Sequence, residues 1–414
     1  MVDVSKTVKV ERVSGEGIPS FFGYYDISPE SPYGDKVLYN IPPFTDRMPE
    51  MGDELIVGFT VDNVQFNEIG RTAAWNYQEG CRLQWLDNER IIYNIIEDGK
   101  IKSAIYDIED KRVDKKYEYP VYSVDRKNLK AISYNLYRSR YSYPHTRDKE
   151  ETDYDSDGIF LLDLESGKAD LIISLKSLSD QKVAKNTWVE HAVFNPSGDK
   201  FFFFHRGEIE TGGFFTRFCV SDLEGNIKVL LDSGMCSHSG WMDDNKVTSW
   251  ARIPSRINSL QKSGFLQKSG LWKIAAGIYH AVVKKPEMRQ KITNEAYVVF
   301  DTESLENYKI ENKEFVRDGH ETWSHDGRYM LTDTYPDEDS CRHLMLYDYR
   351  EDIVYYLGKF HSYPEIGTEA YENIPGIRCD LHPKWSFGEK YVYFDSTHEG
   401  YRGLYRIDIS GITK

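Results

Sequence analysis

One pattern recurs along this chain of 414 residues: a large aromatic residue, a polar turn with Gly, Asn or Asp, and then an apolar strand. This order of signals indicates a β-hairpin. Clear copies are FNPSGDKFFFF at 194–204, WMDDNKVTSW at 241–250, WSHDGRYMLTD at 323–333 and WSFGEKYVYFD at 385–395. Earlier copies are ISPESPYGDKVLYN at 27–40, WLDNERIIYN at 85–94 and the weaker SVDRKNLKAIS at 123–133.

A third strand that ends in Asp often follows, as in SAIYDIED at 103–110 and FCVSDLEGN at 218–226. A small antiparallel sheet of this kind cannot bury both of its faces alone, but stacked copies arranged in a ring can. The seven units therefore predict an all-β fold, a seven-bladed β-propeller formed by residues 1–414 as a single domain. The last unit lacks an outer strand, and TVKVERVS at 7–14 is predicted to supply it and close the ring.

Two segments interrupt the period. Residues 138–157 are charged and rich in Tyr, which predicts a surface loop. Residues 252–292 include GLWKIAAGIYHAVV, whose apolar spacing suits a helix that ends before Pro286. We expect this short amphipathic helix to lie against the propeller rim; a substrate lid and an oligomer contact are the alternatives.

The composition excludes several classes of function. The net charge of −15 argues against general binding of nucleic acid or of anionic membranes. The five Cys form no CxxC pair, so a disulfide framework and a zinc ribbon are not expected. No secretory signal and no apolar run long enough to span a membrane is seen, so we expect a cytoplasmic protein. The oligomeric state is left open.

Four of the eleven His stand three residues before an aromatic anchor. The pseudo-rotation of a propeller brings equivalent positions together, so these four side chains are predicted to meet at one mouth of the central channel. Such a cluster suits a metal ion or an acid–base centre; a buried His that ties a strand to a turn is the alternative. The four residues are His191, His238, His320 and His382.

Other polar residues are predicted to share that mouth. Asp380 lies two residues before His382 and so on the same face of its strand. A guanidinium matches a planar carboxylate, so the arginines are candidates to bind one; surface charge is the alternative. The further candidates are Tyr25, Asp26, Arg82, Gln84, His205, Arg206 and Arg217.

The stretches HAVFNPSGDKFFFFHRG, SHSGW, GHETWSHDGRYMLTD and LHPKWSFGEKYVYFDSTHEGYRGLYRIDI resemble the oligogalacturonate lyases, propellers distantly similar to TolB. FFGYYDISP and AWNYQEGCRLQW are similar to bacterial propellers linked to surface-polysaccharide genes. The lyase resemblance implies a divalent ion held by His and Gln, typically manganese, with calcium and zinc as other possibilities. His320 and His382 match its metal-binding blades, while Asp380 stands where a further His is expected.

The resemblance implies β-elimination on an oligosaccharide or polysaccharide that contains uronic acid. His320, His382 and Asp380 would hold the metal, with Arg217 or Arg82 helping to stabilise the enolate-like state. His238 or His191 would be the base, and Tyr25 the acid. The expected substrate-binding residues are Arg82, Gln84, His205, Arg206 and Asp26. Two alternatives are a non-catalytic propeller that binds carbohydrate or protein, and a glycoside hydrolase that uses Asp26 and Asp380.

Overall fold

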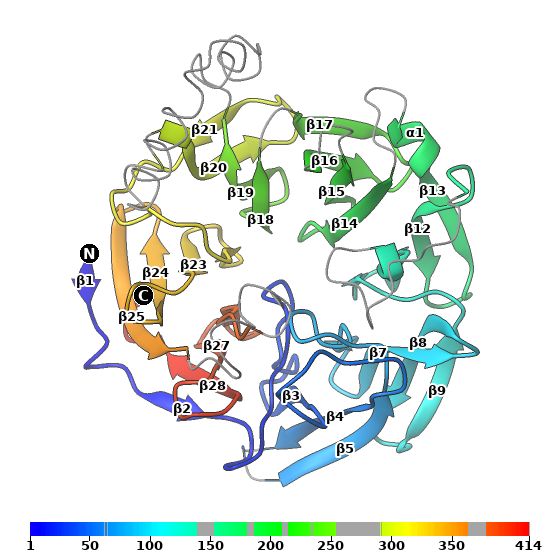
Figure 1. Cartoon of the computed structure of the whole chain (residues 1–414), viewed down its shortest axis with the longest axis horizontal. Coiled ribbons are helices and arrows are strands. Elements are labelled where there is room, and N and C mark those ends of the chain that lie inside the picture. The colour runs from blue at the N-terminus through cyan, green and yellow to red at the C-terminus, as the bar shows by residue number, and fades with distance from the viewer. Residues whose placement is uncertain are drawn as a thin grey trace, which may run out of the picture.

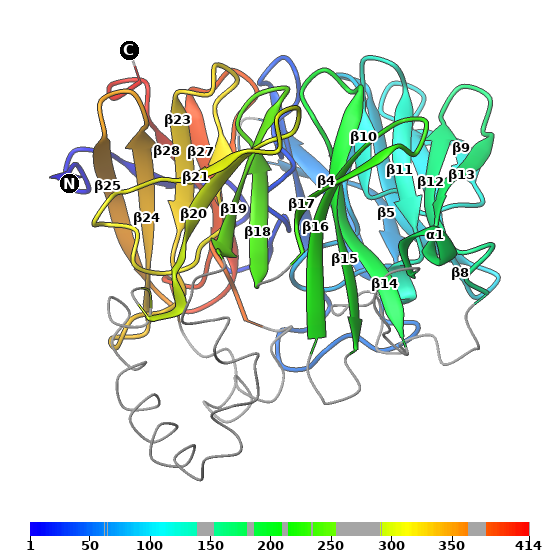
Figure 2. The same cartoon turned by 90° about the horizontal axis from the view of Figure 1, so that it is seen from above.

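Seven antiparallel sheets stand in a ring around a central channel, as a computed structural model shows (Figures 1 and 2). The structure describes residues 1–61, 63, 65–138, 153–179, 186–208, 214–232, 235–253, 290, 292–362 and 378–413. The predicted all-β, seven-bladed propeller is confirmed. The strands of each blade follow one another in chain order from the centre of the ring to the rim, and in blades 6 and 7 a strand of the N-terminal segment lies outside the last of them.

The blades are numbered in chain order. Blade 1 has β3 (Lys36–Ile41), β4 (Leu55–Val61) and β5 (Gln65–Thr72). Blade 2 has β6 (Gln84–Trp85), β7 (Arg90–Glu97), β8 (Lys100–Asp107) and β9 (Arg112–Tyr117). Blade 3 has β10 (Ser123–Asp125), β11 (Lys130–Tyr134), β12 (Gly158–Asp163) and β13 (Ala169–Ser174). Blade 4 has β14 (Thr187–Phe194), β15 (Lys200–Glu208), β16 (Phe214–Asp222) and β17 (Ile227–Leu231). Blade 5 has β18 (Cys236–Trp241), β19 (Lys246–Arg252), β20 (Glu295–Asp301) and β21 (Asn307–Lys309). Blade 6 has β22 (Thr322–Trp323), β23 (Tyr329–Asp333), β24 (Cys341–Asp348) and β25 (Ile353–His361), and blade 7 has β26 (Lys384–Trp385), β27 (Tyr391–Ser396) and β28 (Gly403–Asp408).

The run FFFF in β15 shows why the middle strands are apolar on both faces. Successive side chains of a strand point to opposite faces. Phe201 and Phe203 pack in a core cluster shared with blade 3, whereas Phe202 and Phe204 pack in one shared with blade 5. All four are buried, so a continuous apolar run is what a strand between two blades requires.

The N-terminal segment closes the ring, as predicted. β2 (Val10–Arg12) pairs antiparallel with β28, and Val10 lies opposite Ile407. The Arg12 side chain adds to this closure, since its Nη1 lies 2.8 Å from a Glu399 carboxylate oxygen and 2.7 Å from the Tyr405 hydroxyl. A second contact was not predicted: β1 (Val2–Asp3) pairs parallel with β25 as a fifth strand of blade 6.

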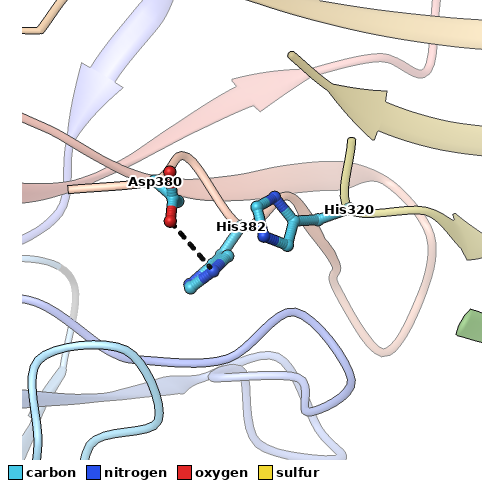
Figure 3. Close-up of side chains that lie close together, drawn as sticks. All are labelled: His320, Asp380 and His382. Carbon is cyan, nitrogen blue, oxygen red and sulfur yellow. Dashed lines mark ion pairs between the residues drawn. The ribbon is translucent and has the colours of Figure 1, made fainter. Parts of the chain in front are cut away.

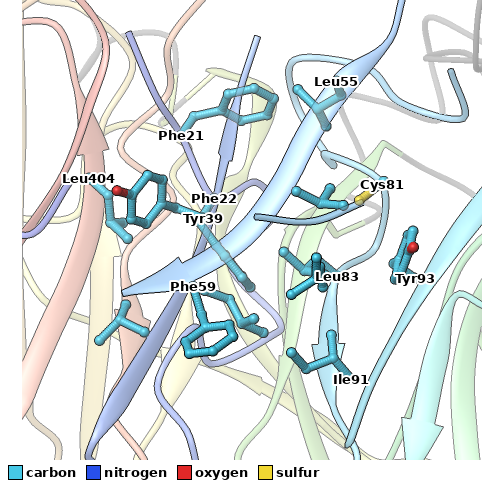
Figure 4. Close-up of a cluster of buried hydrophobic side chains, with 14 of the residues drawn as sticks. Phe21, Phe22, Tyr39, Leu55, Phe59, Cys81, Leu83, Ile91, Tyr93 and Leu404 are labelled. Carbon is cyan, nitrogen blue, oxygen red and sulfur yellow. The ribbon is translucent and has the colours of Figure 1, made fainter. Parts of the chain in front are cut away.

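The chain then enters the channel before it forms blade 1. The backbone N–H groups of Phe22 and Gly23 donate to the Asp395 carboxylate of blade 7, at 2.8 and 3.2 Å. Gly23 has φ of 130°, and a Cβ there would lie 2.8 Å from the Glu79 carbonyl oxygen, so this close approach requires glycine. Phe21 and Phe22 belong to the core cluster drawn in Figure 4. The buried Tyr24 and Tyr25 follow.

Both predicted insertions fall largely outside the described residues. Of the surface loop predicted at 138–157, residues 139–152 are not described, and the ends beside that gap pair through Arg138 Nε and an Asp157 carboxylate oxygen at 2.9 Å. The helix-bearing insertion predicted at 252–292 is described only at its ends. In the described part of the chain, η1 (Leu136–Arg138) and α1 (Leu175–Ser179) are helical, as are residues 290 and 292–293, and no helix is long and apolar enough to cross a membrane. The five Cys are buried, and none of them forms a disulfide.

Candidate metal and acid–base site

The four His of the repeat meet inside the channel, although each comes from a different blade. The ring centroids of His238 and His320 are 4.0 Å apart, and those of His320 and His382 are 4.3 Å apart. His191 joins them through Tyr24, on which it stacks at 5.1 Å and which lies 5.0 Å from His382. The repeat therefore places these imidazoles in one site.

The site is deeper than an open mouth. His320 and His382 are each only 2% exposed. His382 and His191 have φ of 44° and 54°, and Arg82, at the same repeat position in blade 2, has φ of 55°. Residues other than glycine rarely adopt this left-handed conformation, which is tolerated where the surrounding structure fixes it and often marks functional sites.

His320, Asp380 and His382 form a potential metal site, because one ligand atom from each lies within 4.8 Å of the others (Figure 3). His320 Nδ1 bonds the Asp333 carboxylate at 2.8 Å, and His382 Nδ1 bonds the Gly23 carbonyl oxygen at 3.1 Å. These bonds leave the Nε2 atoms to bind an ion. His382 Nε2 is buried without a hydrogen-bond partner among the described residues.

The electrostatics favour neutral imidazoles beside an ionised carboxylate. Burial lowers the pKa of His320 and of His382, so both are held in the neutral form that binds metals. Burial alone would raise the pKa of Asp380, but Arg342 and Arg378 outweigh it and hold that pKa well below its usual range. Each guanidinium lies 2.6 Å from one Asp380 oxygen, and each oxygen keeps a further lone pair.

Asp333 is a site residue that the sequence reasoning missed. One carboxylate oxygen accepts from His320 Nδ1 and from the His320 backbone N–H, both at 2.8 Å. The other accepts the backbone N–H of His382 at 3.2 Å. Asp333 thus fixes two blades together. Its signal was present, since WSHDGRYMLTD and WSFGEKYVYFD both end in Asp, and Asp395 in the second copy also binds the backbone of the next blade.

Asp318 was missed as well. Its carboxylate accepts a hydrogen bond from His238 Nδ1 at 2.9 Å. The imidazole proton is therefore on Nδ1, and Nε2 carries the free lone pair. Asp318 stands two residues before His320, as Asp380 stands two residues before His382. The alternation that identified Asp380 could therefore have identified Asp318.

His191 also takes part in a second buried hydrogen-bond network. Its Nδ1 is 2.7 Å from the Tyr122 hydroxyl, and that hydroxyl donates to Glu79 at 3.1 Å. Burial, with the charge of Arg206 next, lowers the pKa of His191 well below its usual value. Burial also raises the pKa of Glu79 to about 7, although Arg82 opposes the rise.

Three predicted substrate-binding residues bond to one another or to the same carbonyl. Arg82 binds Asp26 through two bonds, at 3.0 and 2.6 Å, and also donates to the Tyr122 carbonyl oxygen. Gln84 donates to that same carbonyl at 3.1 Å. Arg82 is fully buried, and its guanidinium is already bound to the carboxylate of Asp26.

His205 and Arg206 are neighbours on β15 and therefore lie on opposite faces. Arg206 reaches a Glu190 carboxylate oxygen at 2.8 Å and lies on the side of the His191 network. His205 pairs in register with Arg217, whose Nε donates to Asp232 at 3.1 Å. Burial lowers the pKa of His205 to about 4. No contact in the described part of the chain brings His205 or Arg217 to the four His.

Tyr25 lies beneath the cluster. Its ring centroid is 5.2 Å from that of His320 and 6.1 Å from that of His238. The hydroxyl donates to the Ser239 carbonyl oxygen at 3.3 Å and accepts the Ser239 backbone N–H at 2.9 Å. Burial, with the charge of Glu321 next, raises the pKa of Tyr25 well above its usual value. Tyr25 is thus a protonated side chain bonded to the backbone.

Comparison with known sequences gives no relative: no family model and no curated protein matches the chain. Solved structures do match. An oligogalacturonate lyase from Vibrio parahaemolyticus has a TM-score of 0.65 at 15% identity, over 100% of this chain and 97% of that chain. An oligogalacturonate lyase in complex with manganese has a TM-score of 0.65 at 14% identity, over 100% and 96%. The tricorn protease has a TM-score of 0.53 at 11% identity, over 95% of this chain and 34% of that chain. This chain therefore shares its propeller fold with the oligogalacturonate lyases, as the resemblance in sequence implied.

Proposed function

We propose that this protein is a metal-dependent lyase that cleaves a uronic-acid-containing oligosaccharide or polysaccharide by β-elimination. The observation that carries the proposal is the contact between His238, whose imidazole is oriented by a carboxylate, and His320, a member of the potential metal site formed with Asp380 and His382. The fold shared with oligogalacturonate lyases supports it.

The residues fit a divalent ion. Two neutral imidazole nitrogens and one carboxylate form a donor set that suits manganese, zinc or iron, and a three-residue set leaves positions open for substrate. The unpartnered Nε2 of buried His382 is the atom that such an ion would satisfy. When bound, the ion would supply a Lewis acid that neutralises the substrate carboxylate and makes the proton α to it more acidic.

His238 is the proposed base. Asp318 holds its Nδ1–H, so Nε2 is the basic atom, as in other carboxylate–imidazole pairs that abstract protons. His191 is the less suitable candidate because burial lowers its pKa and because the partner of its Nδ1 is the Tyr122 hydroxyl rather than a carboxylate. The buried Arg82 is already bound to Asp26, so we assign it the role of fixing the channel wall.

The glycoside-hydrolase alternative has less support. A general acid must carry a proton at neutral pH. The arginines that flank Asp380 keep its pKa well below the usual range, and Arg82 forms a bidentate pair with Asp26. Asp380 is therefore not placed to remain protonated, and the carboxylate of Asp26 is already engaged by a guanidinium.

The test combines metal titration with product detection. The purified protein is stripped of metal and titrated with Mn²⁺, and it is expected to bind one ion. With that ion bound, it is expected to convert a homogalacturonan or glucuronan oligomer into an unsaturated product that absorbs ultraviolet light. His320→Ala should lose both properties, whereas His343→Ala, which lies on β24 outside the cluster, should keep both. Stoichiometric Mn²⁺ binding without product from any uronate oligomer would contradict the lyase and favour a binding protein.

A further inference from the structure

A cavity lies farther along the inner strands than the four His. Its volume is about 420 Å³. Its wall is formed where the inner strands end: Phe194 and Trp241 line it, whereas His191 and His238 lie three residues earlier on the same strands. At about 3.3 Å per residue, that spacing separates the two sites by roughly 10 Å along each strand.

Aromatic rings held by the neighbouring blade form much of the wall. The indole N–H of Trp85 donates to the Pro29 carbonyl oxygen at 2.9 Å, and that of Trp241 donates to the Val193 carbonyl oxygen at 3.0 Å. Trp323 donates to the Thr248 hydroxyl at 2.8 Å. Because these bonds engage the polar edge of each ring, the surface left for a ligand is flat, apolar and fixed in position.

Two cations stand at the rim of this cavity on the turn after β10. The guanidinium carbon of Arg126 lies 4.0 Å from the ring centroid of Phe387. In the described part of the chain, neither Arg126 nor Lys127 forms an ion pair. The nearby Asp125 carboxylate is engaged by the turn itself, through the Lys127 backbone N–H at 3.0 Å and Asn128 Nδ2 at 2.6 Å.

We propose that this cavity is a second binding site, for a sugar ring that carries a carboxylate, such as a uronic acid residue. The flat aromatic wall suits the apolar face of a pyranose, and the guanidinium fork of Arg126 matches a carboxylate. In a chain with a net charge of −15, two cations that form no ion pair with any described residue, beside an aromatic cavity, favour an anionic ligand.

The two sites are separate binding places. Tyr25 lines the cavity on one side, while its ring contacts His320 on the other, so a side chain divides the channel. Binding in the cavity therefore does not require metal, a base or bond cleavage, and it holds whether or not the protein is a lyase.

The experiment uses the full-length His320→Ala/His382→Ala protein, so that the metal site cannot contribute. Four of the eight Trp line the cavity, and intrinsic fluorescence therefore reports its occupation. Titration with galacturonic acid, a monosaccharide with no glycosidic bond to cleave, is expected to give a saturable change. Neutral galactose should bind at least 10-fold more weakly, and so should inorganic phosphate.

Variants then locate the binding. Arg126→Ala/Lys127→Ala should weaken galacturonate binding at least 10-fold. Arg112→Ala/Lys168→Ala removes two exposed cations, one on β9 and one in the turn before β13, and should leave galacturonate binding unchanged. Equal binding of galactose would overturn the carboxylate assignment, and equal binding of phosphate would overturn the sugar assignment. Loss in both double variants, or no saturable change with any probe, would overturn the site.

Discussion

The carboxylate of Asp318 lies 2.9 Å from Nδ1 of His238, and the two residues belong to neighbouring repeats of the ring. His238 is part of β18 in blade 5, whereas Asp318 stands on the connection that leads into β22 of blade 6. The pair exists only because the blades are docked. The orientation of the proposed base is thus set by the junction between two repeats.

Asp318→Asn is expected to lower kcat roughly 10–100-fold, with Mn²⁺ affinity and KM little changed. An amide in that place can donate to Nδ1, which favours the tautomer that carries its proton on Nε2. Steady-state kinetics on a uronate oligomer measure the effect. Asp337→Asn is the matched control, because Asp337 pairs with His343 at 2.9 Å outside the cluster. Equal losses in both variants would contradict a positioning role for Asp318.

Asp333→Asn is expected to weaken Mn²⁺ binding roughly 10–100-fold, as removal of a carboxylate behind a metal-binding imidazole usually does. Asp333 orients His320 and also holds the backbone of His382. Calorimetric titration of the metal-free protein measures the affinity. Asp348→Asn breaks a pair with Arg328, which stands just before β23 of blade 6, and should leave the affinity unchanged. An unaltered affinity in Asp333→Asn would place the ion elsewhere.

Glu79→Gln is expected to stabilise the protein at pH 8 and to have little effect at pH 4.5. Burial raises the folded-state pKa of Glu79 to about 7 from the ordinary 4.5, so stability present below pH 4.5 is lost as the pH rises to about 7. The neutral amide avoids that loss, which is on the order of 3 kcal/mol. Urea unfolding at the two pH values measures the difference. Glu224→Gln, at an exposed position, should show none.

Removal of residues 1–14 is expected to destabilise the fold by several kcal/mol, because it deletes β1, β2 and the buried Val13. Removal of residues 1–5 deletes β1 alone and should cost much less, since β1 pairs through only two residues. Calorimetric melting of both truncated proteins provides the comparison. Equal melting temperatures for the full chain and the longer truncation would show that β2 does not hold the ring closed.

The repeat predicted the fold and the meeting of the four His, since a pseudo-rotation converts equal sequence positions into neighbours in space. It also contained Asp318, at the spacing that identified Asp380, and Asp333, at the Asp that ends two of the hairpin copies. The placement of His205 beside Arg206 in one site ignored strand alternation, which puts them on opposite faces. Sequence patterns describe one blade at a time, and these residues act across blade junctions.

Other features carry no local signal. Asp26 and Arg82 are 56 residues apart, and their pairing depends on the entry of the N-terminal segment into the channel. FFGYYDIS has the composition of an ordinary strand. Only the complete ring shows that Asp395 holds its backbone and that Tyr24 and Tyr25 lie among the His.

The pairing of Val10 with Ile407 also sets the order of events during synthesis. β2 is translated before every blade, yet its partner strand β28 is translated after blades 1 to 6. Until then, blades 1 to 6 can form as local meanders, but the final edge remains open and available to other chains. A newly made chain is therefore most vulnerable to intermolecular strand exchange in the interval before blade 7 is complete, and that interval ends when β2 pairs with β28.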